Sequence, residues 1–166
     1  MRMELHQPYE NLTYYGRGPF ENYIDRYSGA FIGRYEDKVE NQFYWYIRPQ
    51  ETGNKTDVRW LTLLDSGGLG VKITGLQPIS FSALHFSPED LDPGLTRKLQ
   101  HTIDIVPQKN IFLHVDLKQR GLGGDNSWGM YPHNEYRLLD KKYTYSYMIE
   151  LVEKGSDKND YLNSRK

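Results

Sequence analysis

Hydrophobic residues recur at every second position in several short stretches of the chain. In residues 111–117 the odd-numbered positions are all aliphatic, whereas Phe112, His114 and Asp116 share the other face. Residues 143–151 repeat the pattern, with aromatic or aliphatic side chains at every odd-numbered position. A period of two residues is typical of a β-strand with one face in a core. Both stretches are therefore predicted to be strands.

Other stretches add to the number of expected strands. Residues 58–64 are apolar at nearly every position, which predicts a central strand covered on both faces. Glycine and proline interrupt the chain at short intervals between Gly16 and Gly129. Closely spaced strands and turns predict an all-β fold, an antiparallel sandwich or barrel. Further strands are predicted at residues 41–47, 70–74, 79–86 and 99–106.

One short helix is predicted near residues 88–92. Ser87 is a capping residue, Pro88 suits the first helical position, and an acidic first turn follows. Pro93 and Gly94 are expected to end the helix almost at once.

Length and composition limit what the chain can be. Its 166 residues fit one domain, predicted over residues 1–153, with a flexible tail over residues 154–166. A catalytic (β/α)₈ barrel of roughly 250 residues is excluded. With 21 Lys and Arg against 22 Asp and Glu, the net charge of −1 argues against a nucleic-acid partner. The absence of cysteine excludes disulfides and cysteine nucleophiles.

The sequence leaves the cellular compartment open. No stretch approaches the 18 apolar residues of a membrane span, and residues 1–6 lack the apolar core of a signal peptide. We therefore expect a soluble chain with no membrane partner, in either the cytoplasm or the periplasm.

Residues 121–129 form a glycine-rich stretch after a strong strand. A phosphate-binding loop is rejected because no helical pattern follows and the lysine of such a loop is missing. What remains is a tryptophan, Trp128, beside Asp125, Asn126 and Ser127. The indole could fold back as a lid over the end of the sandwich. Alternatively it could stack on the C–H face of a sugar while its polar neighbours bind hydroxyls, which makes these four residues the candidate substrate-binding site.

Histidines and carboxylates do not form a recognisable catalytic or metal-binding pattern. His101 and His114 are expected on strands without zinc-ligand spacing, and His85 is expected at the edge of the core. Glu51 and Asn54 flank a glycine turn and are assigned no role. The sequence therefore predicts no metal site and no catalytic residue.

Charged residues in apolar surroundings are interpreted as structural pairs. Glu21 is predicted to pair with Arg17 or Arg26, because bidentate arginine–carboxylate contacts commonly hold segments in place. Asp57 and Arg59 lie in an otherwise buried run, so they too should be paired inside the protein.

Several phrases stand in a characteristic order along residues 12–152. Together they resemble the C-terminal domain, also called the small chain or domain 5 region, of the bacterial β-galactosidases of glycoside hydrolase family 2. The first phrases are YGRGPFENYIDR at residues 15–26 and PQETG at 49–53, which is followed by DVRW at 57–60. LHFS at residues 84–87 begins a stretch that extends to Asp92, and His101 comes after it. The last phrase is the segment from Val115 to Trp128, which ends in GGDNSW.

The resemblance implies a β-sandwich of the galactose-mutarotase-like type that closes over one side of a barrel's active site. It also implies that Trp128 helps to form the platform for the sugar on the leaving-group side. The nucleophile, the acid/base glutamate and the magnesium and sodium ligands belong to other domains of such enzymes, so no cofactor is expected in this chain. The implied partners are the rest of the β-galactosidase and a galactoside or acceptor sugar.

Three other functions stay open at this point. The chain could be a free-standing carbohydrate-binding module, because it is rich in aromatic residues. It could be an aldose 1-epimerase that uses His85 or His114 as its acid, by analogy of fold. It could serve assembly alone, through the aromatic residues 43–46 or by pairing of copies. Met1 and the polar run after it suggest an excised fragment or a separately encoded small subunit.

Overall fold

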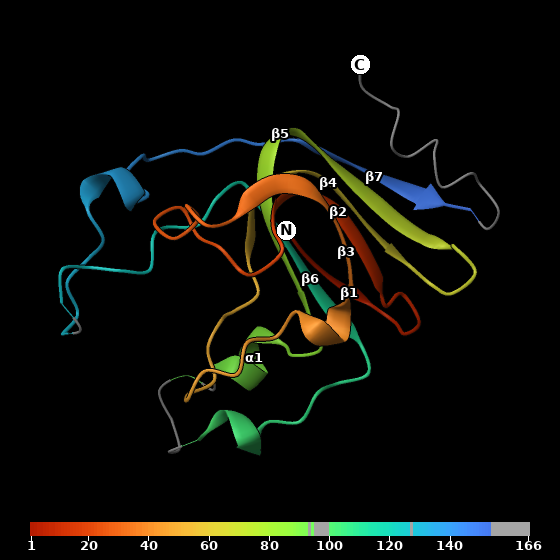
Figure 1. The fold of residues 1–166 in the computed structure, drawn as a ribbon, viewed down its shortest axis with the longest axis horizontal. Helices are drawn as coiled ribbons and strands as arrows, with labels where there is room; N and C mark the ends of the chain where they lie inside the picture. The colour runs from red at the N-terminus through yellow and green to blue at the C-terminus, as the bar shows by residue number, and fades with distance from the viewer. Residues whose placement is uncertain (93, 95–99, 127, 154–166) are drawn as a thin grey trace.

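The computed structural model describes residues 1–92, 94, 100–126 and 128–153 (Figure 1). One α-helix is defined in this part, α1 (Pro88–Leu91), with 3₁₀ helices at Val39–Asn41, Thr102–Asp104 and Asn134–Tyr136. The strands are β1 (Arg2–Leu5), β2 (Asn11–Gly18), β3 (Phe31–Lys38), β4 (Lys55–Leu64), β5 (Gly70–Leu84), β6 (Ile111–Asp116) and β7 (Tyr147–Val152).

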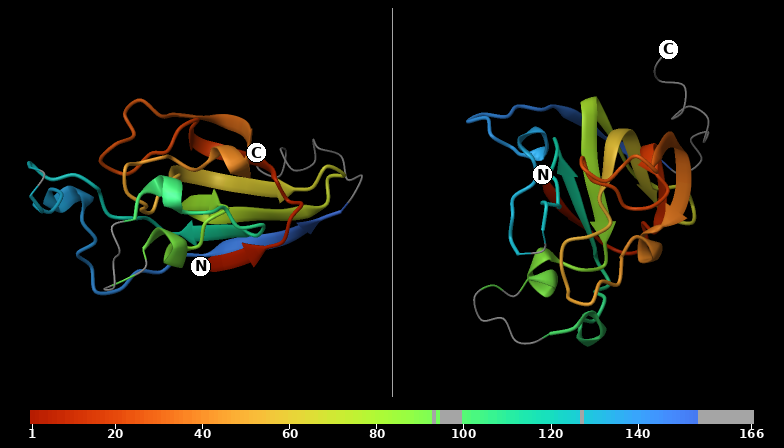
Figure 2. Two further views of the ribbon diagram at one scale, coloured as in Figure 1. Left: turned by 90° about the horizontal axis from the view of Figure 1, so that it is seen from below. Right: turned by 60° about the vertical axis from the view of Figure 1, so that its left-hand side comes forward.

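The strands form one antiparallel sheet in the order β1-β6-β5-β4-β2-β3. The long strand β5 pairs with β4 on one side. On its other side, residues 70–75 pair with β7 and residues 80–84 pair with β6. Figure 2 shows a curved layer, with α1 and the long connections gathered towards one end. The fold is therefore an antiparallel all-β fold of the sandwich type, as the sequence predicted.

The change of partner along β5 has a local cause. A Cβ atom on Gly75 would lie 2.3 Å from the carbonyl oxygen of Gln77, so only glycine leaves room for this bend. Pro78 follows and has no N–H to donate to a neighbouring strand. Together, Gly75 and Pro78 separate the part of β5 that pairs with β7 from the part that pairs with β6.

Alternating side chains of the strands fill the core on one face of the sheet. The aliphatic residues of β6 are completely buried, as the period of two predicted. Tyr14 packs on Tyr35 and Phe81, with ring centroids 5.4 and 5.3 Å apart. Burial of each such side chain stabilises the fold by roughly 1.5–3 kcal/mol.

Several predicted elements are confirmed. Residues 58–64 lie within β4, between β2 and β5. The predicted strands at 70–74 and 79–86 are two parts of the single strand β5, which ends at Leu84. Helix α1 begins after Ser87, whose hydroxyl accepts the Asp90 N–H at 3.1 Å while the Asp90 carboxylate accepts the Ser87 N–H at 2.7 Å.

The strand predictions at 41–47 and 99–106 are wrong. Residues 43–47 alternate in polarity without joining the sheet, because the Tyr44 and Tyr46 hydroxyls bind a polar cluster on one side. On the other side, Trp45 contacts Phe43. The described residues of the second stretch contain a 3₁₀ helix, whose N-terminus is capped by Asp104, so His101 does not lie on a strand.

The last strand also differs from its prediction. β7 begins at Tyr147 instead of residue 143. Ile149 and Leu151, expected on a core face, are 45% and 83% exposed. They lie opposite Ile73 and Val71 of β5, at a margin of the sheet that no other described segment covers.

The predicted tail, residues 154–166, lies outside the described residues, and the domain limits 1–153 stay a prediction. Within the described part of the chain, no helix is long and apolar enough to cross a membrane.

Candidate functional site

Trp128 lies at the protein surface, within a glycine-rich loop. Its side chain is 91% exposed, so the indole does not pack as a lid over the sheet. Its backbone N–H donates to Asn126 Oδ1 at 2.9 Å, the hydrogen bond typical of an Asx turn. Asp125 lies in the same exposed loop, and Ser127 lies outside the described residues. The structure thus gathers the other three candidate residues on one loop with an outward-facing ring.

Asp125 already has a partner that the sequence analysis missed. His133 Nε2 lies 2.7 Å from Asp125 Oδ1, and this hydrogen bond raises the pKa of His133. The eight-residue separation follows no familiar ligand spacing, so no signal in the sequence could have found this contact. A hydroxyl bound by Asp125 would share the carboxylate with His133.

Asp25 anchors the start of the loop that carries Trp128, described over residues 121–126 and 128–129 and called the Trp128 loop. Its Oδ2 accepts the Gly123 N–H at 2.8 Å, although the two residues lie 98 positions apart. Gly121 donates its own N–H to the Tyr136 carbonyl at 2.7 Å. A Cβ atom on Gly121 would come within 2.6 Å of Asp25 Oδ2, so the close approach requires glycine.

We expect Asp25→Ala to loosen this anchor and to speed amide hydrogen exchange at Gly123 by roughly 10- to 100-fold. A hydrogen bond to a charged group contributes about 1.5–3 kcal/mol, and its loss lowers the free energy of local opening. Exchange measured by NMR checks this. Asp125→Ala is the matched control, because within the described part of the chain it removes the contact to His133 and none to Gly123. Equal exchange in wild type and Asp25→Ala would contradict the anchoring role.

Glu21, in the same turn of the chain as Asp25, is the centre of a polar cluster. Its side chain is 1% exposed and its Oε1 accepts hydrogen bonds from Arg26 and the Tyr46 hydroxyl. Its Oε2 accepts the Thr52 hydroxyl and the Gly53 N–H, both at 2.8 Å. Every side of the carboxylate is therefore engaged by a donor from the fold.

These contacts set the charge state of Glu21. Burial alone would raise its pKa, but the hydrogen bonds from Tyr46, Gly53, Thr52 and Arg26 together lower the pKa below its ordinary value. The predicted pair with Arg26 is therefore present. The alternative partner, Arg17, instead binds Asp57 at 2.5 Å and the Ala30 carbonyl at 3.0 Å.

The structure also shows the surroundings of Asp57, Arg59 and Asn54. Asp57 is paired as expected, whereas Arg59 donates to the Asp57 carbonyl oxygen and to no carboxylate of the described residues. Asn54, assigned no role from sequence, is 1% exposed and donates to the Asn22 carbonyl at 2.8 Å. The turn from Glu21 to Arg26 therefore ties segment 52–54 to the start of the Trp128 loop.

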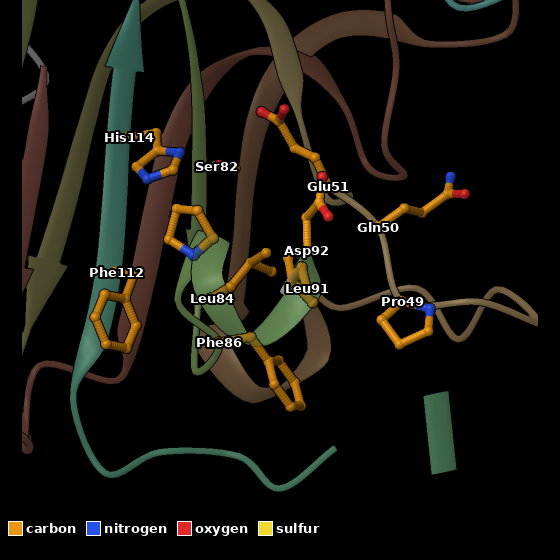
Figure 3. Close-up of a pocket in the computed structure, with 11 residues that line it drawn as sticks. Pro49, Gln50, Glu51, Ser82, Leu84, Phe86, Leu91, Asp92, Phe112 and His114 are labelled. Atoms are coloured by element: carbon orange, nitrogen blue, oxygen red, sulfur yellow. The ribbon is translucent and has the colours of Figure 1, made fainter. Parts of the chain in front are cut away.

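A pocket of about 280 Å³ lies between residues 49–51, α1 and the outer face of β5 and β6 (Figure 3). The aromatic rings of Phe86 and Phe112 line part of the pocket wall. His114 and Glu51 add polar groups to the lining. Glu51 Oε1 accepts a hydrogen bond from Gln119 Nε2 at 2.6 Å, which connects the pocket to the segment that leads into the Trp128 loop. Such a lining could hold a small molecule with one apolar face and several hydroxyls.

The remaining histidines have structural surroundings. His85 is held by the Asn110 carbonyl at 3.2 Å and by the Glu10 carboxylate at 3.0 Å. His101 lies beside Asp104 at the surface. Among the described residues, no group of three His, Cys, Asp or Glu side chains could hold a metal ion.

A family model described as "Beta galactosidase small chain" matches residues 1–149. The chain is 37% identical over 151 residues to the "Beta-galactosidase" of Priestia megaterium, an alignment that covers 90% of this chain and 14% of that protein. It is 38% identical over 144 residues to the "Beta-galactosidase" of Streptococcus thermophilus, covering 86% and 14%. It is 36% identical over 133 residues to "Beta-galactosidase BgaC" of Bifidobacterium adolescentis, covering 78% and 12%. The chain thus spans only 12–14% of the length of these relatives.

Proposed function

Because this chain belongs to the beta galactosidase small chain family, we propose that it is the C-terminal accessory domain of a glycoside hydrolase family 2 β-galactosidase. In this proposal the bond-breaking machinery lies in the rest of the enzyme. A retaining glycosidase needs two carboxylates held about 5 Å apart on a rigid frame. The magnesium and sodium sites implied for such enzymes would likewise lie outside this chain.

The observation that carries the proposal is the outward-facing indole of Trp128. An exposed ring, on a residue whose backbone N–H is bound by Asn126, offers its face to the apolar C–H side of a pyranose. Asp125 and Asn126 stand beside it as acceptors for hydroxyl groups. One ring makes only half a site, so the rest of the enzyme would supply the opposite wall.

The curved antiparallel sheet supports the finer fold assignment within this proposal. Its margin at β7 leaves Ile149 and Leu151 uncovered, as expected of part of a larger sandwich of the galactose-mutarotase-like type. The role of the domain is then to close one side of the sugar site. We propose that the isolated chain does not hydrolyse galactosides.

Trp128→Ala, tested in the enzyme reconstituted from this chain and the rest of a β-galactosidase, should weaken binding of the leaving-group sugar. The expected loss is about 1 kcal/mol or slightly more, a fivefold to tenfold effect, because an aromatic stacking contact and its buried area are removed. KM for lactose and the rate of galactosyl transfer to added glucose measure it.

Trp128→Phe is the matched control and should retain part of the binding, since it keeps an aromatic face. Unchanged KM and unchanged transfer to glucose in Trp128→Ala would refute the platform role.

A further inference from the structure

Four large apolar side chains stand exposed at the end of the molecule that carries α1. Trp45 is 65% exposed, Ile47 84%, Ile103 87% and Val106 77%. These four residues are called the Trp45 patch. They do not belong to the Trp128 loop, and the activity proposed above gives them no task.

The fold brings the two segments of the Trp45 patch together. The Thr102 N–H donates to the Ile47 carbonyl at 3.4 Å, and the Thr102 hydroxyl donates to the Tyr46 carbonyl. Ile103 follows Thr102 directly in the chain. In Figure 1 both segments lie near α1, on the side of the molecule away from the β4–β5 hairpin.

A second, smaller core supports the Trp45 patch from below. The indole of Trp45 packs edge-on against Phe43 and Phe86, with centroid distances of 5.0 and 6.4 Å. Ile105, between the exposed Ile103 and Val106, is buried in the same cluster. The indole of Trp45 is therefore held by this core, so this aromatic anchor needs little further ordering before it binds a partner.

The composition of the surface fits a protein interface. A tryptophan stands with three aliphatic side chains, and exposed Arg48, His101 and Asp104 adjoin them in the chain. An apolar centre with polar neighbours and an aromatic anchor is the usual make-up of a binding surface. A group of large apolar side chains exposed together is typical of a surface that another protein covers.

We propose that the Trp45 patch is the surface on which the rest of the β-galactosidase docks, an inference that rests on the proposed function. The relatives continue well beyond the matched region, since this chain covers only 14% of the Priestia megaterium protein. They therefore contain ample protein to cover the patch.

The position of the patch relative to the candidate site supports this choice of partner. The same segment that exposes Trp45 and Ile47 binds Glu21 through Tyr46 on its other side. It then continues directly into residues 49–51, which line the pocket. A protein docked on the patch would therefore stand next to the pocket and to the polar cluster around Glu21, in the turn that also carries Asp25.

Ile47→Asp and Ile103→Asp test the proposal. Each should weaken binding of this chain to the rest of the β-galactosidase at least tenfold, measured by sedimentation velocity and by recovered activity on a chromogenic galactoside. Both side chains are already exposed, so the variants should keep the wild-type Tm. Leu69→Asp is the control, because Leu69 is exposed on the β4–β5 hairpin, away from α1 (Figure 1). It should bind as the wild type does.

Each other outcome has a distinct meaning. Wild-type affinity in both patch variants, or equal weakening by Leu69→Asp, would overturn the docking surface and leave the proposed function intact. Self-association of the wild-type chain through the patch, lost in the variants while binding to the rest of the enzyme persists, would overturn it in favour of a second copy. Failure of the wild-type chain to bind the rest of the enzyme at all would count against the proposed function itself.

Discussion

Glu21→Ala is expected to destabilise the protein by about 2–6 kcal/mol, because it leaves two buried donors unsatisfied and each such group costs roughly 1–3 kcal/mol. The carboxylate is 1% exposed and accepts hydrogen bonds from four groups. Its removal leaves the Thr52 hydroxyl and the Gly53 N–H buried without their acceptor. It also frees Arg26 and Tyr46 from the turn that they hold in place.

Urea unfolding followed by circular dichroism measures this effect. Glu36→Ala is the matched control, since Glu36 pairs with Arg34 at the surface and both side chains are well exposed. Exposed pairs contribute about 0–1 kcal/mol, so the control should unfold close to the wild type. If Glu21→Ala and Glu36→Ala unfold at the same urea concentration, Glu21 is not the structural centre described here.

Stability should rise with pH between about pH 8 and 10, because Lys55 is buried in the folded protein. Burial lowers the pKa of Lys55 from 10.5 to about 8, although Glu21 and Asp37 partly offset that effect. Its Nζ donates to Gln42 Oε1 at 2.9 Å and to the Gly53 carbonyl at 3.2 Å. In this pH range the unfolded chain holds the proton that the folded chain has released. Rising pH therefore favours the folded state by up to about 1.4 kcal/mol per pH unit.

The range ends near pH 10 because buried tyrosines act in the opposite direction. Burial raises the pKa of Tyr14 and Tyr23, so the folded chain keeps their protons after the unfolded chain has lost them. Their contribution to stability therefore falls above about pH 10.

The urea midpoint measured from pH 7 to 10 tests the role of Lys55. Lys55→Met should lose the rise with pH, because the buried titrating group is gone. Lys38→Met removes an exposed lysine and should keep the rise. Parallel pH profiles for wild type and Lys55→Met would show that Lys55 does not titrate as its burial requires.

Strand prediction missed β2, because only half of its inner face carries large apolar side chains and the other half is glycine. In β2 the buried positions are Leu12, Tyr14, Gly16 and Gly18. A Cβ atom on Gly16 would lie 2.7 Å from Val58, so close packing demands glycine at a core position. A strand with glycine at core positions cannot be recognised from the pattern of hydrophobic residues alone.

The candidate site was predictable in part. An exposed polar loop around Trp128 follows from the glycines and from the neighbouring polar residues, because both act over a few positions. The partners Asp25 and His133 do not follow, since each depends on a chain path that brings distant segments together. The same holds for Glu51, which became a pocket residue through α1 and β6.

Local chemistry was enough to establish the all-β class, the strand β6 and the capped turn at Ser87, because alternation and capping depend on neighbours a few residues apart. Contacts between distant segments decided the rest. They selected Arg26 as the partner of Glu21, left the apolar face of β7 uncovered and placed residues 43–47 outside the sheet. The physical reason is that pairing and burial depend on which segments the folded chain brings together.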